Sequence, residues 1–220
     1  MQIYLIRRPI FAKILFMKIS ILADDILFDH LVQLNEKVIW NRIHQLELSV
    51  IDDKVDAFIN LMENASEFDY SYIQKPVFIN SVIDTLQEKN QSNLVVRING
   101  WNGFIQKNVW EIAGAMHTKH EEILNTLNKK HEIVADQPGF VAPRVIAMII
   151  NEAYFAKSEA VSTEDEIDTA MKLGTNYPKG PFEWCREIGI QQVYKLLKKL
   201  SLQDKRYLPS SQLIMEATIS

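Results

Sequence analysis

The chain has 220 residues, of which 47% are hydrophobic and 24% charged, and its formal net charge is −4. A chain of this length can bury one good core or two small ones. The acidic balance argues against a nucleic-acid groove, and no run reaches the roughly 18 apolar residues of a membrane helix. The single cysteine, Cys185, excludes an intrachain disulfide and a cysteine metal cluster. We therefore expect a cytoplasmic protein that binds neither nucleic acid nor a membrane.

Residues 1–16 are basic and apolar, but Lys13 and Lys18 interrupt the run that a secretory signal would need. Met17 is followed by Lys18 and Ile19, as at a natural chain start. We interpret residues 1–16 as a translation-start artefact, and a leader or an extra strand are the alternatives.

Up to residue 135 the sequence alternates short β-branched or apolar runs with segments of helical spacing. Such runs are typical of buried strands, and apolar residues three and four positions apart indicate helices. The expected strands lie at residues 18–22, 44–51, 56–61, 76–80, 93–98 and 131–136. The expected helices lie at residues 25–34, 82–89 and 117–129. This order predicts an α/β domain with a mostly parallel sheet and crossover connections.

From Phe140 onward the pattern is helical throughout. A first helix of about 18 residues is apolar nearly all round, which predicts burial in a helical core or in a subunit interface. Ser162 or Thr163 is placed to cap a second helix, and Glu166 is placed to close a capping box from Thr163. Gly174 ends that helix, and a third helix follows a loop rich in proline and glycine.

Several motifs in this helical part stand at fixed spacings. They read DQPGFVAPR from residue 136, NEA from residue 151, EDEIDTAMKLG from residue 164 and GP from residue 180. Together they resemble the C-terminal domain of the 3-hydroxyacyl-CoA dehydrogenases, over roughly residues 134–209. The resemblance implies a Rossmann-like domain, here reduced, at residues 17–135. It also implies a helical domain like that of 6-phosphogluconate dehydrogenase at residues 136–220.

The resemblance implies NAD as the cofactor, yet the glycine-rich loop that binds its pyrophosphate is missing. Aligned on the family's G-x-G-x-x-G, the three glycine positions are Ala23, Asp25 and Phe28. A carboxylate at Asp25 would repel the phosphates, and the first glycine of the whole sequence is Gly100. From the sequence we therefore expect no bound cofactor.

A second difference concerns the segment that resembles the family's H-F-F-N-P. Aligning the family's asparagine on Asn102 places Asn99 at the catalytic histidine and Glu111, twelve residues later, at the glutamate that partners it. We expect Asn99 and Glu111 to lie side by side on neighbouring strands, facing the cleft between the domains. The same alignment implies that Asn102 contacts substrate.

Asparagine does not titrate, so Asn99 could orient a carbonyl but could not act as the base. Glu111 is then the one catalytic candidate, and its alternative role is a hydrogen bond to Asn99. Pro143 replaces the family's asparagine near the substrate carbonyl and cannot donate a hydrogen bond, although proline suits the first turn of a helix.

The remaining chemistry-bearing residues have simpler interpretations. We expect all five histidines at the surface and no metal site, because His117 and His120 form a pair without a third ligand. The lysines between residues 195 and 205 form either a solvated helix face or a patch for CoA phosphates. Cys185 has no paired base and is expected to pack.

The sequence thus predicts a protein like the 3-hydroxyacyl-CoA dehydrogenases, by family an NAD-dependent oxidoreductase acting on 3-hydroxyacyl-CoA. The alternative is a catalytically inactive relative that binds acyl-CoA or a partner protein. We also expect a homodimer built on the C-terminal helices, because the helix that starts near Phe140 carries more apolar surface than one small domain can cover.

Overall fold

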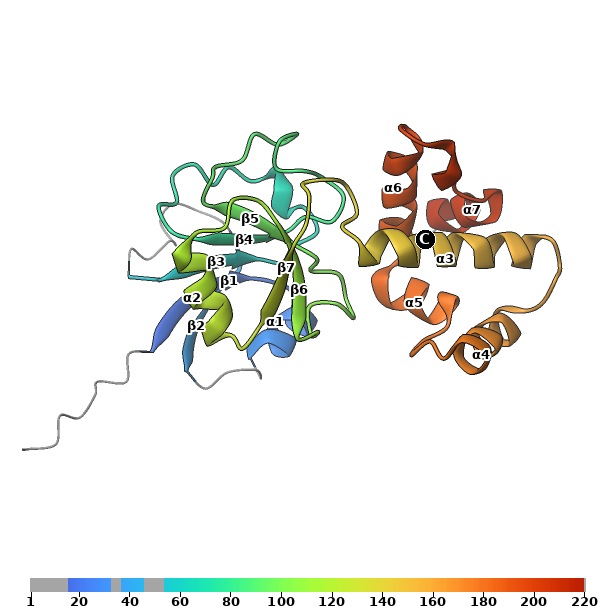
Figure 1. The fold of residues 1–220 in the computed structure, drawn as a ribbon, viewed down its shortest axis with the longest axis horizontal. Helices are drawn as coiled ribbons and strands as arrows, with labels where there is room; N and C mark the ends of the chain where they lie inside the picture. Colours follow the sequence, from blue (N-terminus) through green and yellow to red (C-terminus); the bar gives the residue numbers. More distant parts are fainter. Residues whose placement is uncertain (1–15, 33–36, 46–53, 220) are drawn as a thin grey trace, which may run out of the picture.

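The computed structural model describes residues 16–32, 37–45 and 54–219, which form a sheet domain and a helical domain (Figure 1). In the described residues, seven strands form one sheet of order β2-β1-β3-β4-β5-β6-β7. The strands are β1 (Met17–Leu22), β2 (Val38–Ile43), β3 (Ala57–Asn60), β4 (Val77–Asn80), β5 (Val95–Ile98), β6 (Val109–Ala113) and β7 (Lys130–Ile133).

All neighbouring strands of the sheet are parallel except β5 and β6. The residues of β3, β4 and β5 are buried throughout, as expected for central strands that are covered on both faces. The chain order reverses at β1, which has β2 on one side and β3 on the other. Such a switch point is where doubly wound sheets place their ligands.

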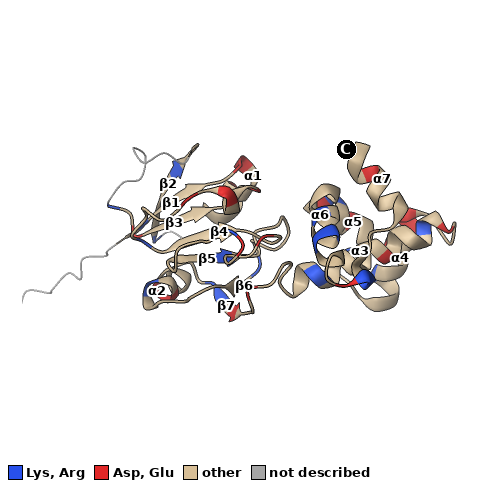
Figure 2. Ribbon diagram, turned by 90° about the horizontal axis from the view of Figure 1, so that it is seen from above, with Lys and Arg blue, Asp and Glu red and all other residues tan. Residues whose placement is uncertain are grey.

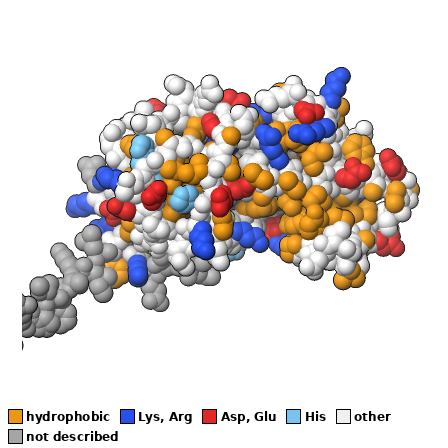
Figure 3. Space-filling model, in the orientation of Figure 1, with side chains coloured by type: hydrophobic (Ala, Val, Ile, Leu, Met, Phe, Trp, Pro, Cys, Tyr) orange, Lys and Arg blue, Asp and Glu red, His pale blue; other side chains and the backbone are white. Residues whose placement is uncertain are grey.

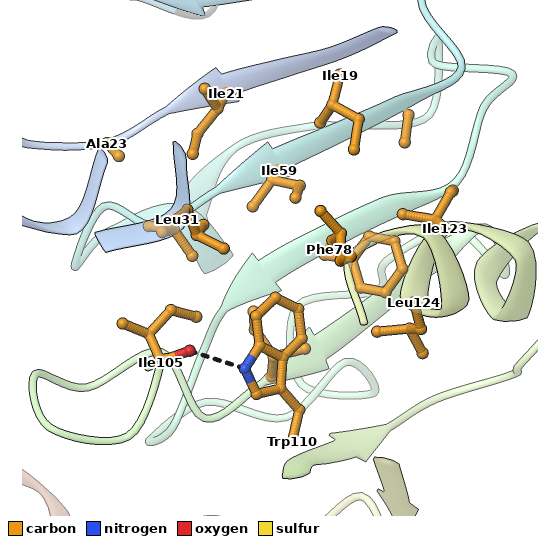
Figure 4. Packing of buried hydrophobic residues seen from close by; sticks show 14 of the residues in the cluster. Ile19, Ile21, Ala23, Leu31, Ile59, Phe78, Ile105, Trp110, Ile123 and Leu124 are labelled. Carbon is orange, nitrogen blue, oxygen red and sulfur yellow. Dashed lines mark hydrogen bonds between the residues drawn. The ribbon is translucent and has the colours of Figure 1, made fainter. Parts of the chain in front are cut away.

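One face of the sheet packs against α1 (Asp25–Val32) and α2 (Thr118–Thr126), as Figure 4 shows. Leu31 of α1 and Leu124 of α2 join the same apolar cluster as Trp110, whose indole N–H donates to the carbonyl of Ile105 at 2.9 Å. The other face is covered by the segment between β3 and β4, which buries Tyr70 completely. Each large side chain buried in this way contributes about 1.5–3 kcal/mol to folding.

The second strand of the described part is β2, which ends at Ile43, whereas the sequence predicts a second strand at residues 44–51; residues 46–53 lie outside the described part. Two polar side chains obscured β2 in the sequence. Asn41 donates to the hydroxyl of Ser20 at 3.0 Å, and Arg42 donates to the carbonyl of Ala23 at 3.2 Å. The neighbouring strand β1 and the residue that follows it therefore satisfy polar groups that would otherwise disfavour a strand.

The predicted helix at residues 82–89 is wrong, since this segment consists of turns and bends. Several of its backbone groups bond to side chains from other parts of the chain. Arg97 donates to the carbonyls of Ser81 and Asp84, and the carboxylate of Asp136 accepts from the N–H groups of Leu86 and Gln87. These long-range partners replace the helix ladder.

The helical domain contains α3 (Ala142–Ser158), α4 (Glu164–Thr175), α5 (Pro181–Ile188), α6 (Ile190–Ser201) and α7 (Ser211–Ile219). Its predicted capping box is confirmed. Thr163 is the N-cap of α4, its hydroxyl accepts from the N–H of Glu166, and its own N–H donates back to that carboxylate. Hydrogen bonds from Ser162 and Thr163 lower the pKa of Glu166 to about 2. The fold class predicted from the sequence is confirmed.

The two domains meet at a buried arginine. Arg97 is fully buried, donates to Asp136 at 2.6 Å and to the carbonyl of Gln137, and lies 4.4 Å from the ring centre of Phe140. On α6, Lys199 pairs with Asp84 at 2.7 Å. The connection between β7 and α3 is therefore fixed to the sheet by charge-assisted bonds.

Candidate functional site

The predicted pair of Asn99 and Glu111 is brought together at the junction of the two domains. Asn99 directly follows β5, and Glu111 lies in the middle of β6, the strand antiparallel to it. The Asn99 amide nitrogen donates to Glu111 Oε2 at 3.2 Å. The expectation that these two side chains lie side by side is thus confirmed, although Asn99 lies one residue beyond its strand.

Glu111 also joins the sheet to the helical domain. Its Oε1 atom accepts from the backbone N–H of Val141 at 2.8 Å and of Ala142 at 2.9 Å. These groups belong to the start of α3, where N–H groups have no partner within the helix. Pro143 comes next in this first turn, is buried, and needs no acceptor. The sequence did not reveal the role of these two N–H groups, because a backbone donor cannot be recognised from the type of residue that carries it.

The hydrogen bond fixes which way the Asn99 amide points. An ionised carboxylate can only accept, so the amide nitrogen of Asn99 must face Glu111. The amide oxygen then faces away, and it is buried with no hydrogen-bond partner among the described residues. Asn99 as a whole is 4% exposed. A buried acceptor without a donor costs about 1–3 kcal/mol, so this oxygen is a strained feature of the site.

Asn99 and Glu111 line a cavity of about 400 Å³. Most of its wall is apolar, and the exposed Lys107 lies on its rim. The lining residues are Asn99, Phe104, Lys107, Asn108, Val109, Trp110, Glu111 and Ala142. A cavity of this kind suits a short apolar chain with a polar group near one end.

Asn102, the predicted substrate contact, lines a different cavity of about 430 Å³. Its side-chain oxygen is buried and, within the described residues, also lacks a partner. This second cavity lies past the carboxyl ends of β1, β3, β4 and β5, at the switch point of the sheet. Acidic side chains dominate its charged lining, with one lysine among them: Asp24, Glu63, Glu67, Asp84 and Lys195. The structure therefore separates Asn102 from the Asn99 and Glu111 pair.

Comparison with known families identifies the helical domain. Residues 139–217 match the family described as 3-hydroxyacyl-CoA dehydrogenase, C-terminal domain. The 3-hydroxyadipyl-CoA dehydrogenase of Escherichia coli is 44% identical over 88 residues, which is 39% of this chain and 18% of that protein. The 3-hydroxybutyryl-CoA dehydrogenase of Clostridioides difficile is 38% identical over 79 residues, or 36% of this chain and 28% of that one. The helical domain, at residues 139–217, belongs to the family of 3-hydroxyacyl-CoA dehydrogenase C-terminal domains.

Solved structures extend the likeness to the sheet domain. The (S)-3-hydroxybutyryl-CoA dehydrogenase of Ralstonia eutropha superposes with a TM-score of 0.67 over 93% of this chain and 94% of that one, at 18% identity. At that identity the likeness shows the fold alone. The 3-hydroxybutyryl-CoA dehydrogenase of E. coli is 34% identical, with a TM-score of 0.55, and covers 64% of this chain and 31% of that chain. The sequence alignments with the 3-hydroxyadipyl-CoA dehydrogenase of E. coli and the 3-hydroxybutyryl-CoA dehydrogenase of C. difficile each cover less than a third of the relative's length.

The residues after β1 do not fit the dinucleotide that this dehydrogenase family would bring there. In a dinucleotide site the pyrophosphate accepts N–H groups at the start of the first helix. Here Asp24 Oδ1 accepts the N–H of Leu27 at 2.8 Å, so the carboxylate takes one of these donors itself. Asp25, whose carboxylate the sequence places where it would repel the phosphates, pairs with Arg42 at 2.5 Å. The anion position is therefore already filled by a side chain of the chain.

Two other groups have structural roles in this family member. The expectation that all histidines lie at the surface is wrong for His120, which is fully buried and bonds the carbonyl of Leu94 at 3.0 Å. Burial lowers the pKa of His120, which keeps the ring neutral. Cys185 is buried as expected, and that burial raises the pKa of its thiol to about 11. A thiol of this kind is a poor nucleophile.

The helices in the described part of the chain include none that could cross a bilayer, by length and apolar content. Lysine, arginine and acidic positions are distributed over both domains (Figure 2). The basic patch that the sequence placed between residues 195 and 205 is divided by the fold. Lys199 is committed to Asp84 and Glu88 on the sheet domain, whereas Lys195 lines the switch-point cavity.

Proposed function

We propose that this 3-hydroxyacyl-CoA dehydrogenase-like protein binds a 3-hydroxyacyl-CoA at the cavity of Asn99 and Glu111. The pair carries the proposal, because it lies where the two domains of this family meet and is held by both of them. The apolar wall suits the acyl chain, and Lys107 on the rim offers a cation to the phosphates of CoA. The names of the curated relatives support this ligand class.

The family reaction oxidises the hydroxyl group and needs both a proton acceptor and a nicotinamide. Asn99 stands where the proton acceptor is expected and cannot take a proton. Glu111 accepts three hydrogen bonds, from Asn99, Val141 and Ala142, which assigns it to positioning rather than to proton transfer. We therefore propose that Asn99 and Glu111 recognise the ligand and do not oxidise it by the family's route. NAD-dependent turnover is the second candidate, and the relatives' names favour it.

Two measurements on the same preparation test the proposal. Titration calorimetry with 3-hydroxybutyryl-CoA should give saturable binding with one site per chain. Steady-state assays with acetoacetyl-CoA and NADH should show no consumption of NADH above the blank. Turnover would favour the oxidoreductase, and the absence of any thioester binding would contradict both candidates.

We also propose that the protein is a homodimer formed through its helical domain. Figure 3 shows hydrophobic side chains gathered over this domain. On α3, Ala147 and Ile150 are buried within the domain, whereas Val145 is 53% and Phe155 is 37% exposed. A second copy would cover this remaining face at about 25 cal/mol per Å² of apolar surface, and two-fold dimers are the commonest closed assembly. The single buried cysteine supports a cytoplasmic location.

A further inference from the structure

Asn99 has a buried amide oxygen that lacks a partner within the described residues, and this residue lines the cavity. Glu111 takes a hydrogen from the Asn99 amide nitrogen and so holds the oxygen on the opposite side. That oxygen is buried and has no donor among the described residues, and Asn99 lines the 400 Å³ cavity. A ligand that brings a donor to this oxygen removes the cost of leaving it unsatisfied.

We propose that Asn99 selects the 3-hydroxy form of an acyl thioester over its 3-oxo form. This inference rests on the proposed function, since it assumes that the thioester enters this cavity. A hydroxyl group can donate its hydrogen to the Asn99 oxygen. A ketone offers only lone pairs, which would face another acceptor and repel it. No proton is transferred, because an amide oxygen does not take one at neutral pH.

The orientation of the Asn99 amide depends, through Glu111, on the start of α3. The N–H groups of Val141 and Ala142 require an acceptor at Glu111 Oε1, and the second carboxylate oxygen then faces Asn99. The Asn99 oxygen is buried in the structure, so a ligand reaches it only when the atoms that cover it move aside. The helix start thus controls whether residue 99 presents an oxygen or a nitrogen to the ligand.

The first test compares three thioesters that differ only at carbon 3, namely 3-hydroxybutyryl-CoA, acetoacetyl-CoA and butyryl-CoA. We expect the hydroxy thioester to bind about tenfold more tightly than the oxo thioester. This is the effect of giving one buried acceptor, the Asn99 oxygen, a hydrogen-bond donor. Butyryl-CoA should bind between them, because it neither satisfies nor repels the oxygen. In Asn99→Leu, which fills the same volume without an acceptor, the preference should fall to about one.

The second test reverses the amide. In Glu111→Gln the side-chain oxygen must still face the N–H groups of Val141 and Ala142, so its new NH₂ group faces Asn99. Asn99 then turns its oxygen toward residue 111 and presents its nitrogen to the ligand. We expect the affinity for acetoacetyl-CoA to rise and the tenfold preference to disappear or reverse. Glu121→Gln, the same charge change at an exposed position of α2, is the matched control and should keep the preference.

The outcomes separate this inference from the proposed function. Thermal melts identify variants that lose their fold, and Asn99→Leu and Glu111→Gln test the preference independently. Equal affinity of the wild-type protein for the hydroxy and oxo thioesters overturns the inference but leaves the proposed function intact. A lack of binding for all three thioesters overturns both. A preference that survives in Asn99→Leu assigns the selection to another residue and also overturns the inference.

Discussion

Asparagine in place of histidine keeps part of the geometry of this site and removes its acid-base chemistry. Asn99 reaches Glu111 through a side-chain N–H, as a histidine paired with a carboxylate would. On the opposite side it offers an oxygen, which accepts a hydrogen bond but not a proton. One substitution therefore separates recognition of a hydroxyl group from its activation.

Restoring the histidine should not restore oxidation. In Asn99→His we expect no NADH consumption with acetoacetyl-CoA, because the carboxylate of Asp24 still takes the Leu27 N–H where the pyrophosphate would bind. The assay follows NADH absorbance, with the wild-type protein measured in parallel. Turnover by the variant alone would show that the cofactor binds despite Asp24.

A second residue-scale prediction concerns pH. The pKa of Glu166 is lowered from 4.5 to about 2, so its ionised form stabilises the native state at pH values above 4.5. This contribution is lost as the pH falls from about 4.5 through about 2. The uncharged Glu166→Gln keeps a side chain suited to the capping box. The difference in melting temperature between wild type and Glu166→Gln should therefore shrink as the pH falls below 4.5; a constant difference would contradict the assignment.

At the scale of elements, the segment after β4 shows a tertiary interaction overriding local preference. Its sequence has helical spacing, yet Arg97 and Asp136 bond its backbone into turns. The same arginine bonds the carbonyl of Gln137 just before α3. The turn segment and the domain connection thus depend on one buried cation.

Removing that cation should destabilise both. Arg97→Leu leaves Asp136 without its ion-pair partner, and it removes the Arg97 donor from the buried carbonyl of Ser81 and the partly buried carbonyl of Asp84. We expect the free energy of unfolding to fall by about 3–5 kcal/mol, as for breaking a buried ion pair. Urea unfolding measures the change. Lys119→Met, at an exposed position of α2, is the control and should alter stability by less than about 0.5 kcal/mol.

At the scale of the whole molecule, the helical domain buries one side of α3 and leaves the other partly open. Ala147 and Ile150 face the interior, and Val145 and Phe155 remain accessible. This division agrees with a helix shared between a domain core and an interface.

The dimer prediction is tested at the accessible side of α3. Val145→Asp places a charge on a side chain that is 53% exposed in the single chain, so the chain itself should fold. Light scattering should give twice the chain mass of 25.5 kDa for the wild-type protein and the single mass for the variant. Lys157, which pairs with Glu164 and Glu216 within the domain, is unsuitable for this purpose because its loss would perturb the fold. A wild-type monomer at micromolar concentration would contradict the proposal.

The sequence by itself determined the helical domain and its family. The capping box of Thr163 and Glu166 and the apolar spacing of α3 are local features of the sequence. In the structure they correspond to interactions between residues that are close in the chain. The sequence also determined that Asn99 and Glu111 would meet, because their separation of twelve residues fits two adjacent strands. These features could be predicted because the groups involved are close in the chain or fixed in register.

The tertiary structure alone decided which atom of Asn99 is left for a ligand. That choice depends on backbone N–H groups of α3, which lie 30 and 31 residues after Glu111. It likewise decided the turns at residues 82–89 and the separation of Asn102 from the pair. For Asn99 and for the turns, a hydrogen-bond partner from a distant part of the chain decided the outcome. Residue type and spacing cannot record such a partner, because it exists only once the two domains have packed.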